Sequence, residues 1–253
     1  MVKGIVIDCG ADSGTLYLTD DLAFLRMLRA NGEKAAAVLT EENRDADFSG
    51  IPYAVERPEE MEPDDLERLY RRLAGLPWNI LETERCRLRE MTVADVDRLY
   101  EIYADDSITR FMENLFESRE EERRYAADYR RCVYEFYGYG IWIVEEKATG
   151  TVIGRAGLEP GERGVELGYV IARPWQGQGI ASEVCRAVLA FAEREIDCRR
   201  VISRVQSQND ASVALLKKLG FRLTAETDPS GMAVYEYVVK GSDCEGHQAG
   251  NIC

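Results

Sequence analysis

Residues 171–181 read IARPWQGQGIA, and this stretch decides the fold of the larger part of the chain. An apolar strand end is followed by a proline and two glycines, and then by the apolar stripe of a long helix, Ile180, Val184, Val188 and Phe191. Glycines let the backbone turn tightly and approach a ligand closely, and the free N–H groups of a first helical turn favour an anion. The stretch therefore predicts an anion-binding turn such as a pyrophosphate cradle, although taken alone a plain turn is equally compatible. Its spacing differs from both nucleotide phosphate loops, G-x-G-x-x-G and G-x-x-x-x-G-K-[ST].

Alternating strands and helices extend from this turn in both directions. Strands are predicted at residues 85–89, 141–145, 152–158, 165–171, 201–206 and 233–239, and helices at residues 96–103, 117–131 and 211–219. Thr92 and Asp95 form a capping box before the first of these helices. The charged run 117–131 is interpreted as a solvated helix face.

Four segments, taken in order, resemble the GNAT superfamily of N-acetyltransferases. Residues 176–181 (QGQGIA) resemble its Q/R-x-x-G-x-G/A acyl-CoA signature, and residues 83–92 resemble the opening strand of the branch that includes ribosomal-protein N-terminal acetyltransferases. Residues 165–171 resemble its fourth strand. Residues 209–212 followed by 219–221 resemble its N-x-x-S and L-G-F segments. The resemblance spans about 160 residues and implies an α/β (α+β) fold: a central mixed, mostly antiparallel splayed sheet flanked by helices.

The resemblance also implies acetyl-CoA as the acyl donor and a set of binding residues. The backbone of Tyr169, Val170 and Ile171 would hydrogen-bond the pantetheine arm where two strands splay apart, and an N–H there would act as an oxyanion donor. The amides of Gln176, Gly177, Gln178, Gly179, Ile180 and Ala181 would hold the pyrophosphate. Asn209 would contact the pantetheine or the thiol end, with Ser212 assisting, although a turn role for Asn209 stays open.

The catalytic groups are expected on the same strand. A primary amine must lose a proton before it attacks a thioester, so a base helps, and Glu166 is the candidate, with an ordinary exposed strand residue as the equal alternative. The family's frequent acid, a tyrosine before L-G-F, is replaced by Leu216. Solvent or Tyr169 would then protonate the departing thiolate. Cys185, next to the apolar stripe of a helix, is interpreted as a packed thiol rather than a nucleophile.

An aromatic cluster is the candidate acceptor pocket, although core packing is the more common use of such residues. The residues proposed for it are Phe111, Met112, Tyr137, Tyr139 and Trp142.

Composition excludes several classes of function. The net charge is −14, with 17 acidic and 9 basic side chains in residues 1–83, which disfavours nucleic acid as a partner. The only histidine, His247, lies in a polar tail, so histidine-based triads and metal sites are not expected. Seven cysteines without any C-x-x-C pair indicate reduced thiols and no metal site. With no signal peptide or membrane-spanning run, a cytoplasmic location is expected.

Residues 1–78 are predicted to form a small acidic α/β domain with a parallel sheet. It distantly resembles the later half of a haloacid-dehalogenase-like core, but Asp8-Cys9-Gly10 lacks that family's Asp-x-Asp nucleophile motif. A structural, regulatory or dimer-forming role is proposed. Residues 79–240 form the acetyltransferase domain, and residues 241–253 are expected to be a disordered tail.

The sequence thus favours transfer of an acetyl group to a primary amine in a ternary complex. The acceptor is an amine-bearing small molecule or a protein N-terminus, and no membrane partner is expected. The alternative is an acyl-CoA-binding regulatory or scaffold protein without turnover. The oligomeric state stays open, a homodimer included.

Overall fold

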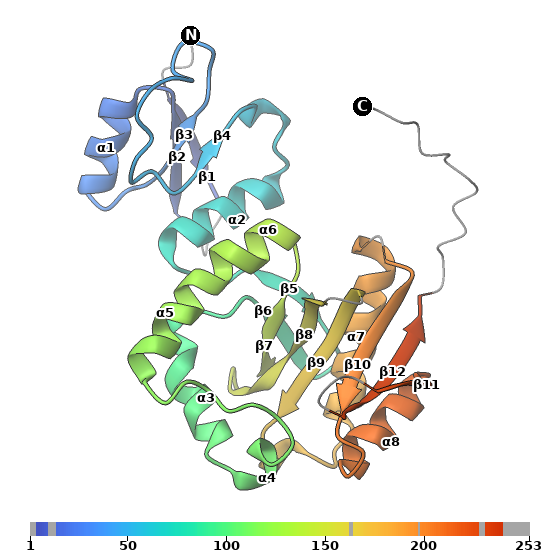
Figure 1. Cartoon of the computed structure of the whole chain (residues 1–253). Coiled ribbons are helices and arrows are strands. Elements are labelled where there is room, and N and C mark those ends of the chain that lie inside the picture. The colour runs from blue at the N-terminus through green and yellow to red at the C-terminus, as the bar shows by residue number, and fades with distance from the viewer. Residues whose placement is uncertain (1–3, 10–13, 162–163, 197, 228–230, 240–253) are drawn as a thin grey trace, which may run out of the picture. The chain divides into compact units, whose positions relative to one another are not determined.

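The computed structural model describes residues 4–9, 14–161, 164–196, 198–227 and 231–239, and its chain divides into two compact units, residues 1–78 and 79–253 (Figure 1). The tail 241–253, with the histidine, lies outside the described residues.

The first unit is a four-stranded sheet with a helix on each face. Its elements are β1 (Ile5–Asp8), β2 (Thr15–Thr19), α1 (Leu22–Ala30), β3 (Lys34–Val38), β4 (Ala54–Val55), the 3₁₀ turn Pro58–Glu60 and α2 (Pro63–Ala74). The strand order is β1-β2-β3-β4, and β2, β3 and β4 are parallel. The expected all-parallel sheet is wrong at β1, which pairs antiparallel with β2. Only residues 9–14 join these two strands, whereas a parallel crossover needs a dozen or more.

Alternation along the strands gives this unit its two small cores. Leu25 and Leu28 of α1 pack against Ala35 and Ala37 of β3. The neighbouring positions on β2 and β3 point to the other face, where they meet Leu69 of α2. The unit is therefore a two-sided α/β layer.

The second unit is built on an eight-stranded sheet of order β11-β12-β10-β9-β8-β7-β6-β5. Its strands are β5 (Asn79–Glu82), β6 (Cys86–Arg89), β7 (Ile141–Glu146), β8 (Val152–Gly161), β9 (Gly164–Ile171), β10 (Arg200–Val205), β11 (Arg222–Thr227) and β12 (Ala233–Val238). Its helices are α3 (Val96–Tyr103), α4 (Asp106–Thr109), α5 (Arg119–Tyr129), α6 (Glu135–Tyr137), α7 (Ile180–Glu195) and α8 (Asp210–Leu219). All neighbouring strands are antiparallel except β9 and β10, which are parallel.

The parallel pair splays apart. β9 pairs with β8 along its whole length, from Gly164 to Ile171. It pairs with β10 only at Val165↔Val201 and Glu166↔Ile202. The second half of β9 therefore has an open edge on the β10 side (Figure 1).

Side-chain alternation along β9 separates two faces of this sheet. Val165, Leu167 and Ile171 belong to the large core that includes Val184 and Val188 of α7. Val170 points to the opposite face, where it packs with residues of α3 and α4. Glu166 and Gly168 share that second face with Val170, because side chains two apart lie on the same side of a strand.

Candidate active site

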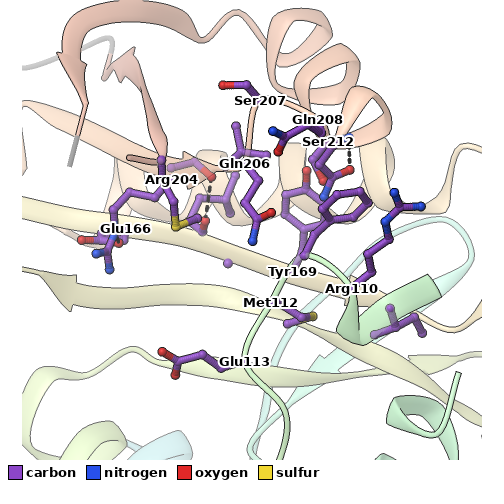
Figure 2. Close-up of a pocket in the computed structure, with 18 of the residues that line it drawn as sticks. Arg110, Met112, Glu113, Glu166, Tyr169, Arg204, Gln206, Ser207, Gln208 and Ser212 are labelled. Carbon is purple, nitrogen blue, oxygen red and sulfur yellow. Dashed lines mark hydrogen bonds and ion pairs between the residues drawn. The ribbon is translucent and has the colours of Figure 1, made fainter. Parts of the chain in front are cut away.

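The divergence of β9 and β10 opens a cleft of about 1080 Å³ (Figure 2). It is lined by the segment after α4, the facing ends of β8 and β9, the end of β10 and the connection to α8. The residues are Ile108, Arg110–Glu113, Glu159, Glu166–Tyr169, Ser203–Asn209, Ser212, Gly231 and Met232.

The open edge of β9 offers backbone groups to this cleft. Ala172 N–H donates to the Ile153 carbonyl on the β8 side at 2.8 Å. In an antiparallel strand the backbone N–H and C=O of one residue point to the same neighbouring strand, and those of the next residue point to the opposite side. Since Ala172 points to β8, the backbone groups of Tyr169 and Ile171 point to the β10 side. Two contacts agree with this alternation: Ser203 Oγ donates to the Leu167 carbonyl at 3.1 Å, and Gln176 Nε2 donates to the Ile171 carbonyl at 2.8 Å. By the same alternation Val170 directs its backbone groups to β8 rather than to the cleft.

The glycine turn lies at the end of this edge. After the 3₁₀ turn Arg173–Trp175, Gly177 and Gly179 adopt left-handed backbone conformations, with φ of 74° and 80°. Gly179 is the N-cap residue of α7, so the first N–H groups of that helix open toward the turn. Left-handed φ is strained for residues with a Cβ, which explains the glycines here.

Arg85 holds this turn in place, a role that sequence reasoning missed. Its Nη1 donates to the Gln178 carbonyl at 3.0 Å, and its Nε donates to the Glu183 carboxylate in the first turn of α7 at 2.8 Å. Its backbone N–H donates to the same carboxylate at 2.9 Å. The only signal in the sequence was that Arg85 lies within residues 83–92, the segment that resembles the opening strand.

Tyr169, Asn209 and Ser212 lie together in the cleft, as expected. Burial raises the pKa of the Tyr169 hydroxyl to about 12, with Ser212 as the polar side chain beside it. Asn209 caps α8, its side-chain oxygen accepting from Ser212 N–H at 3.1 Å, and it also lines the cleft.

Two glutamates on neighbouring strands also line the cleft, Glu166 on β9 and Glu159 on β8. Glu166 forms an ion pair with Arg204, with Nε and Oε2 2.8 Å apart (Figure 2). Glu159 on β8 is directly opposite Glu166 in the strand register. Glu159 is solvent-exposed in this open cleft. Partial desolvation by the groups around it raises the pKa of its carboxyl, and the Glu166 charge adds to this although Arg155 opposes it. Sequence reasoning missed Glu159, and no motif marked it.

Only part of the expected aromatic pocket lines the cleft. Phe111 and Met112 do. Trp142 does not: it is fully buried in the core, with its ring edge-on to Phe191 of α7 at 5.0 Å. Alternation along β7 directs Trp142 to the α7 face, away from Glu159 and Glu166. Tyr137 and Tyr139 pack on each other before β7, with ring centroids 5.9 Å apart, outside the cleft lining.

The comparisons with known proteins identify the family. Residues 85–222 match the acetyltransferase (GNAT) domain family. The chain belongs to the GNAT acetyltransferase family. It is therefore an acetyltransferase.

Relatives of this GNAT chain span the same region. It is 32% identical over 149 residues to the uncharacterized N-acetyltransferase YoaA of Bacillus subtilis, covering 56% of this chain and 82% of YoaA. It is 27% identical over 161 residues to the [ribosomal protein uS5]-alanine N-acetyltransferase of Escherichia coli, covering 58% of this chain and 80% of the relative. Among solved structures, the RimL ribosomal L7/L12 alpha-N-protein acetyltransferase in complex with coenzyme A superposes with a TM-score of 0.53 at 20% identity, covering 64% of this chain and 98% of that one.

Two positions of the GNAT domain are packing residues. Leu216, where the family often has a tyrosine, is fully buried in the core. Cys185 is also fully buried, which raises the pKa of its thiol well above the usual range, as expected of a packed thiol. Within the described residues, no helix is long and apolar enough to cross a bilayer.

Proposed function

We propose that the protein transfers an acetyl group from acetyl-CoA to a primary amine by direct attack in a ternary complex. One observation carries this proposal: the open edge of β9 runs directly into the two-glycine turn at the start of α7. An elongated ligand with amide groups at one end and a pyrophosphate at the other matches that sequence of features.

The residues present fit such a ligand. The backbone of Tyr169 and Ile171 would pair with pantetheine amides as an added strand would. The amides of residues 176–181 would hold the pyrophosphate, with Asn209 and Ser212 beside the arm. Acetyl-CoA would supply a thioester carbonyl, which an N–H of the β9 edge would polarise. The buried Tyr169 hydroxyl, beside Ser212, would protonate the departing sulfur.

A protein N-terminus is the proposed acceptor. An α-amine has a pKa of about 7.7–8.0, so part of it is neutral near pH 7, whereas a lysine amine at about 10.4 is not. The cleft lining holds three carboxylates, on Glu113, Glu159 and Glu166, that favour an ammonium group. Two relatives, the uS5-alanine enzyme and RimL, are named for α-amine acceptors on proteins. One of the cleft carboxylates would receive the amine proton, Glu166 being the residue expected from the sequence.

The runner-up is an acyl-CoA-binding regulator without turnover, which the buried Leu216 favours. Peptides with free N-termini and small amines, each mixed with acetyl-CoA, separate the two functions. Release of CoA thiol with any of them supports the enzyme. Tight binding of acetyl-CoA without thiol release in the presence of any acceptor would favour the regulator. Thiol release only with small amines would mean that the acceptor is a small amine and not a protein N-terminus.

Gly179→Glu tests the placement of the pyrophosphate. Bulk and negative charge in the turn should abolish acetyl-CoA binding, measured by calorimetric titration. The matched control is Gly138→Glu, because Gly138 also has a left-handed φ, 76°, with no atom within 4 Å of an added Cβ, but lies before β7. The control should bind acetyl-CoA like the unmodified protein. Normal binding by Gly179→Glu would show that the turn does not hold the pyrophosphate.

A further inference from the structure

The pair Glu159 and Glu166 is the feature that the family assignment does not explain. The two residues are exact register partners on β8 and β9, and both line the cleft. Directly opposed side chains on antiparallel strands have Cβ atoms about 4.5–5.5 Å apart, and like charges there are destabilising. A destabilising pair of carboxylates in a cleft points to a use in binding or chemistry.

The two carboxylates have different partners. Glu166 is paired with Arg204 at 2.8 Å, and its side chain is 18% exposed. Glu159 forms no ion pair within 4 Å among the described residues, and its contact is the Tyr129 hydroxyl at 3.5 Å. Arg204 is therefore the ion-pair partner of Glu166, and the Glu166 carboxylate raises the pKa of Glu159.

Tyr129 holds Glu159 from the helical side. α5 continues into a π-helical turn, Arg130–Tyr134, which directs both Tyr129 and Tyr134 toward the start of β7. The Tyr129 hydroxyl accepts from Ile141 N–H at 3.0 Å and donates to Glu159. Such π turns inside helices are frequent at functional sites. The groups that face Glu159 are thus Tyr129, Arg155, Glu166 and Arg204.

We propose that Glu159 accepts the proton of the acceptor ammonium and that Glu166, held by Arg204 and paired in register with Glu159, is a positioning residue. This rests on the proposed function. Of the three ammonium protons, one passes to Glu159 and then to solvent, one reaches the sulfur, and one stays in the amide. The nitrogen–carbon bond forms as the carbon–sulfur bond breaks. The raised pKa of Glu159 agrees with this role, because a proton acceptor works best with a pKa near the working pH.

The test compares the pH dependence of kcat in three variants, measured as thiol release with saturating acetyl-CoA and a six-residue peptide with N-terminal alanine. Glu159→Gln should lower kcat by about 10²–10⁴-fold and remove the fall in rate on the acid side. Glu166→Gln should retain a substantial rate but move that fall to lower pH, since a neutral neighbour lowers the pKa of Glu159. Glu101→Gln, a control at an exposed carboxylate of α3 that pairs with Arg98 and lies outside the cleft lining, should leave the profile unchanged.

The opposite pattern, with Glu166→Gln losing the acid-side fall and Glu159→Gln only shifting it, would overturn the assignment. Carbon-13 NMR of the glutamate carboxyls gives a reading independent of turnover and shows that each variant is folded. The Glu159 carboxyl signal is the one missing from the Glu159→Gln spectrum. In the unmodified protein it should titrate above the ordinary value of about 4.3. In Glu166→Gln it should titrate at a lower pH than in the unmodified protein. An ordinary titration refutes the proposal. Such a raised titration without thiol release from any acceptor would instead contradict the proposed function.

Discussion

Tyr169 contributes to the cleft twice, through its backbone on the open edge of β9 and through its buried hydroxyl beside Ser212. These two roles are separable by mutation because the backbone contribution does not depend on the side chain. The family resemblance predicted the first role from the strand. The second depends on burial.

Tyr169→Phe should lower kcat by about 10-fold or more, because general-acid catalysis by one group contributes about 10²–10⁴-fold and solvent replaces part of it. The acetyl-CoA affinity should change little. With its pKa raised to about 12, the hydroxyl stays protonated through pH 9, so no loss of rate up to that pH should come from this group. Thiol release from pH 7 to pH 9 checks both points, and an unchanged kcat in the variant would remove Tyr169 as the acid.

At the scale of elements, Arg85, directly before β6, couples the start of the family match to the two-glycine turn before α7. The Arg85 side chain binds the Gln178 carbonyl and the Glu183 carboxylate, so it limits the motion of the turn. A turn that is already ordered loses less conformational entropy when a ligand binds.

Arg85→Ala should therefore weaken acetyl-CoA binding by roughly tenfold, the equivalent of about 1.4 kcal/mol, with kcat at saturation changed little. Arg87→Ala is the control, because Arg87 lies two residues further on, in β6, and pairs with Glu82 instead of the turn. Calorimetric titration of both variants measures the difference. Equal affinities would mean that the turn is ordered without Arg85.

A buried ion network joins β6 to the start of α3. Arg89, 7% exposed, forms a double hydrogen bond with Asp95 at 2.7 and 2.8 Å and an ion pair with Glu145 at 3.1 Å. Asp95 also accepts from Thr92 N–H, completing the capping box that the sequence predicted. The network therefore fixes where α3 begins on the sheet.

Asp95→Ala should lower the free energy of unfolding by about 3–5 kcal/mol, because it leaves a buried guanidinium without its main partner. Asp97→Ala removes an exposed carboxylate of the next helical turn, paired with Arg119 and Arg123, and should have little effect. Urea unfolding followed by circular dichroism compares the two. Similar losses in both variants would contradict the importance of burial here.

At the scale of the whole molecule, residues 1–78 and 79–253 form separate compact units, each with its own core. The family match begins at residue 85 and leaves the first unit without an assigned role. We propose that the second unit is the complete acetyltransferase domain.

A chain of residues 79–253 should fold cooperatively and bind acetyl-CoA with the affinity of the full chain. The reason is that every residue proposed to hold the ligand belongs to the second unit. Thermal unfolding and calorimetric titration of the shortened and full chains check this. A shortened chain that folds but binds weakly would give the first unit a part in the active site.

Local pattern was sufficient for most elements but not for edge strands. The alternation at 165–171, the stripe at Ile180–Val188 and the capping box at Thr92 correspond to β9, α7 and the start of α3. β5 and β11, at the two edges of the large sheet, were not predicted. Edge strands are half solvated, so they have little apolar alternation for a sequence pattern to detect.

The sequence by itself determined the two-glycine turn and the strand before it, because these depend on glycines and apolar periodicity within about 15 neighbouring residues. Four such local segments in order indicated the family. Only the tertiary structure placed Glu159 opposite Glu166, joined Arg85 to the turn and buried Trp142 against α7. Strand register and the splay of β9 from β10 bring these groups together across 7 to 98 positions of chain. Such pairings depend on which strands become neighbours in the sheet, and no single segment specifies that.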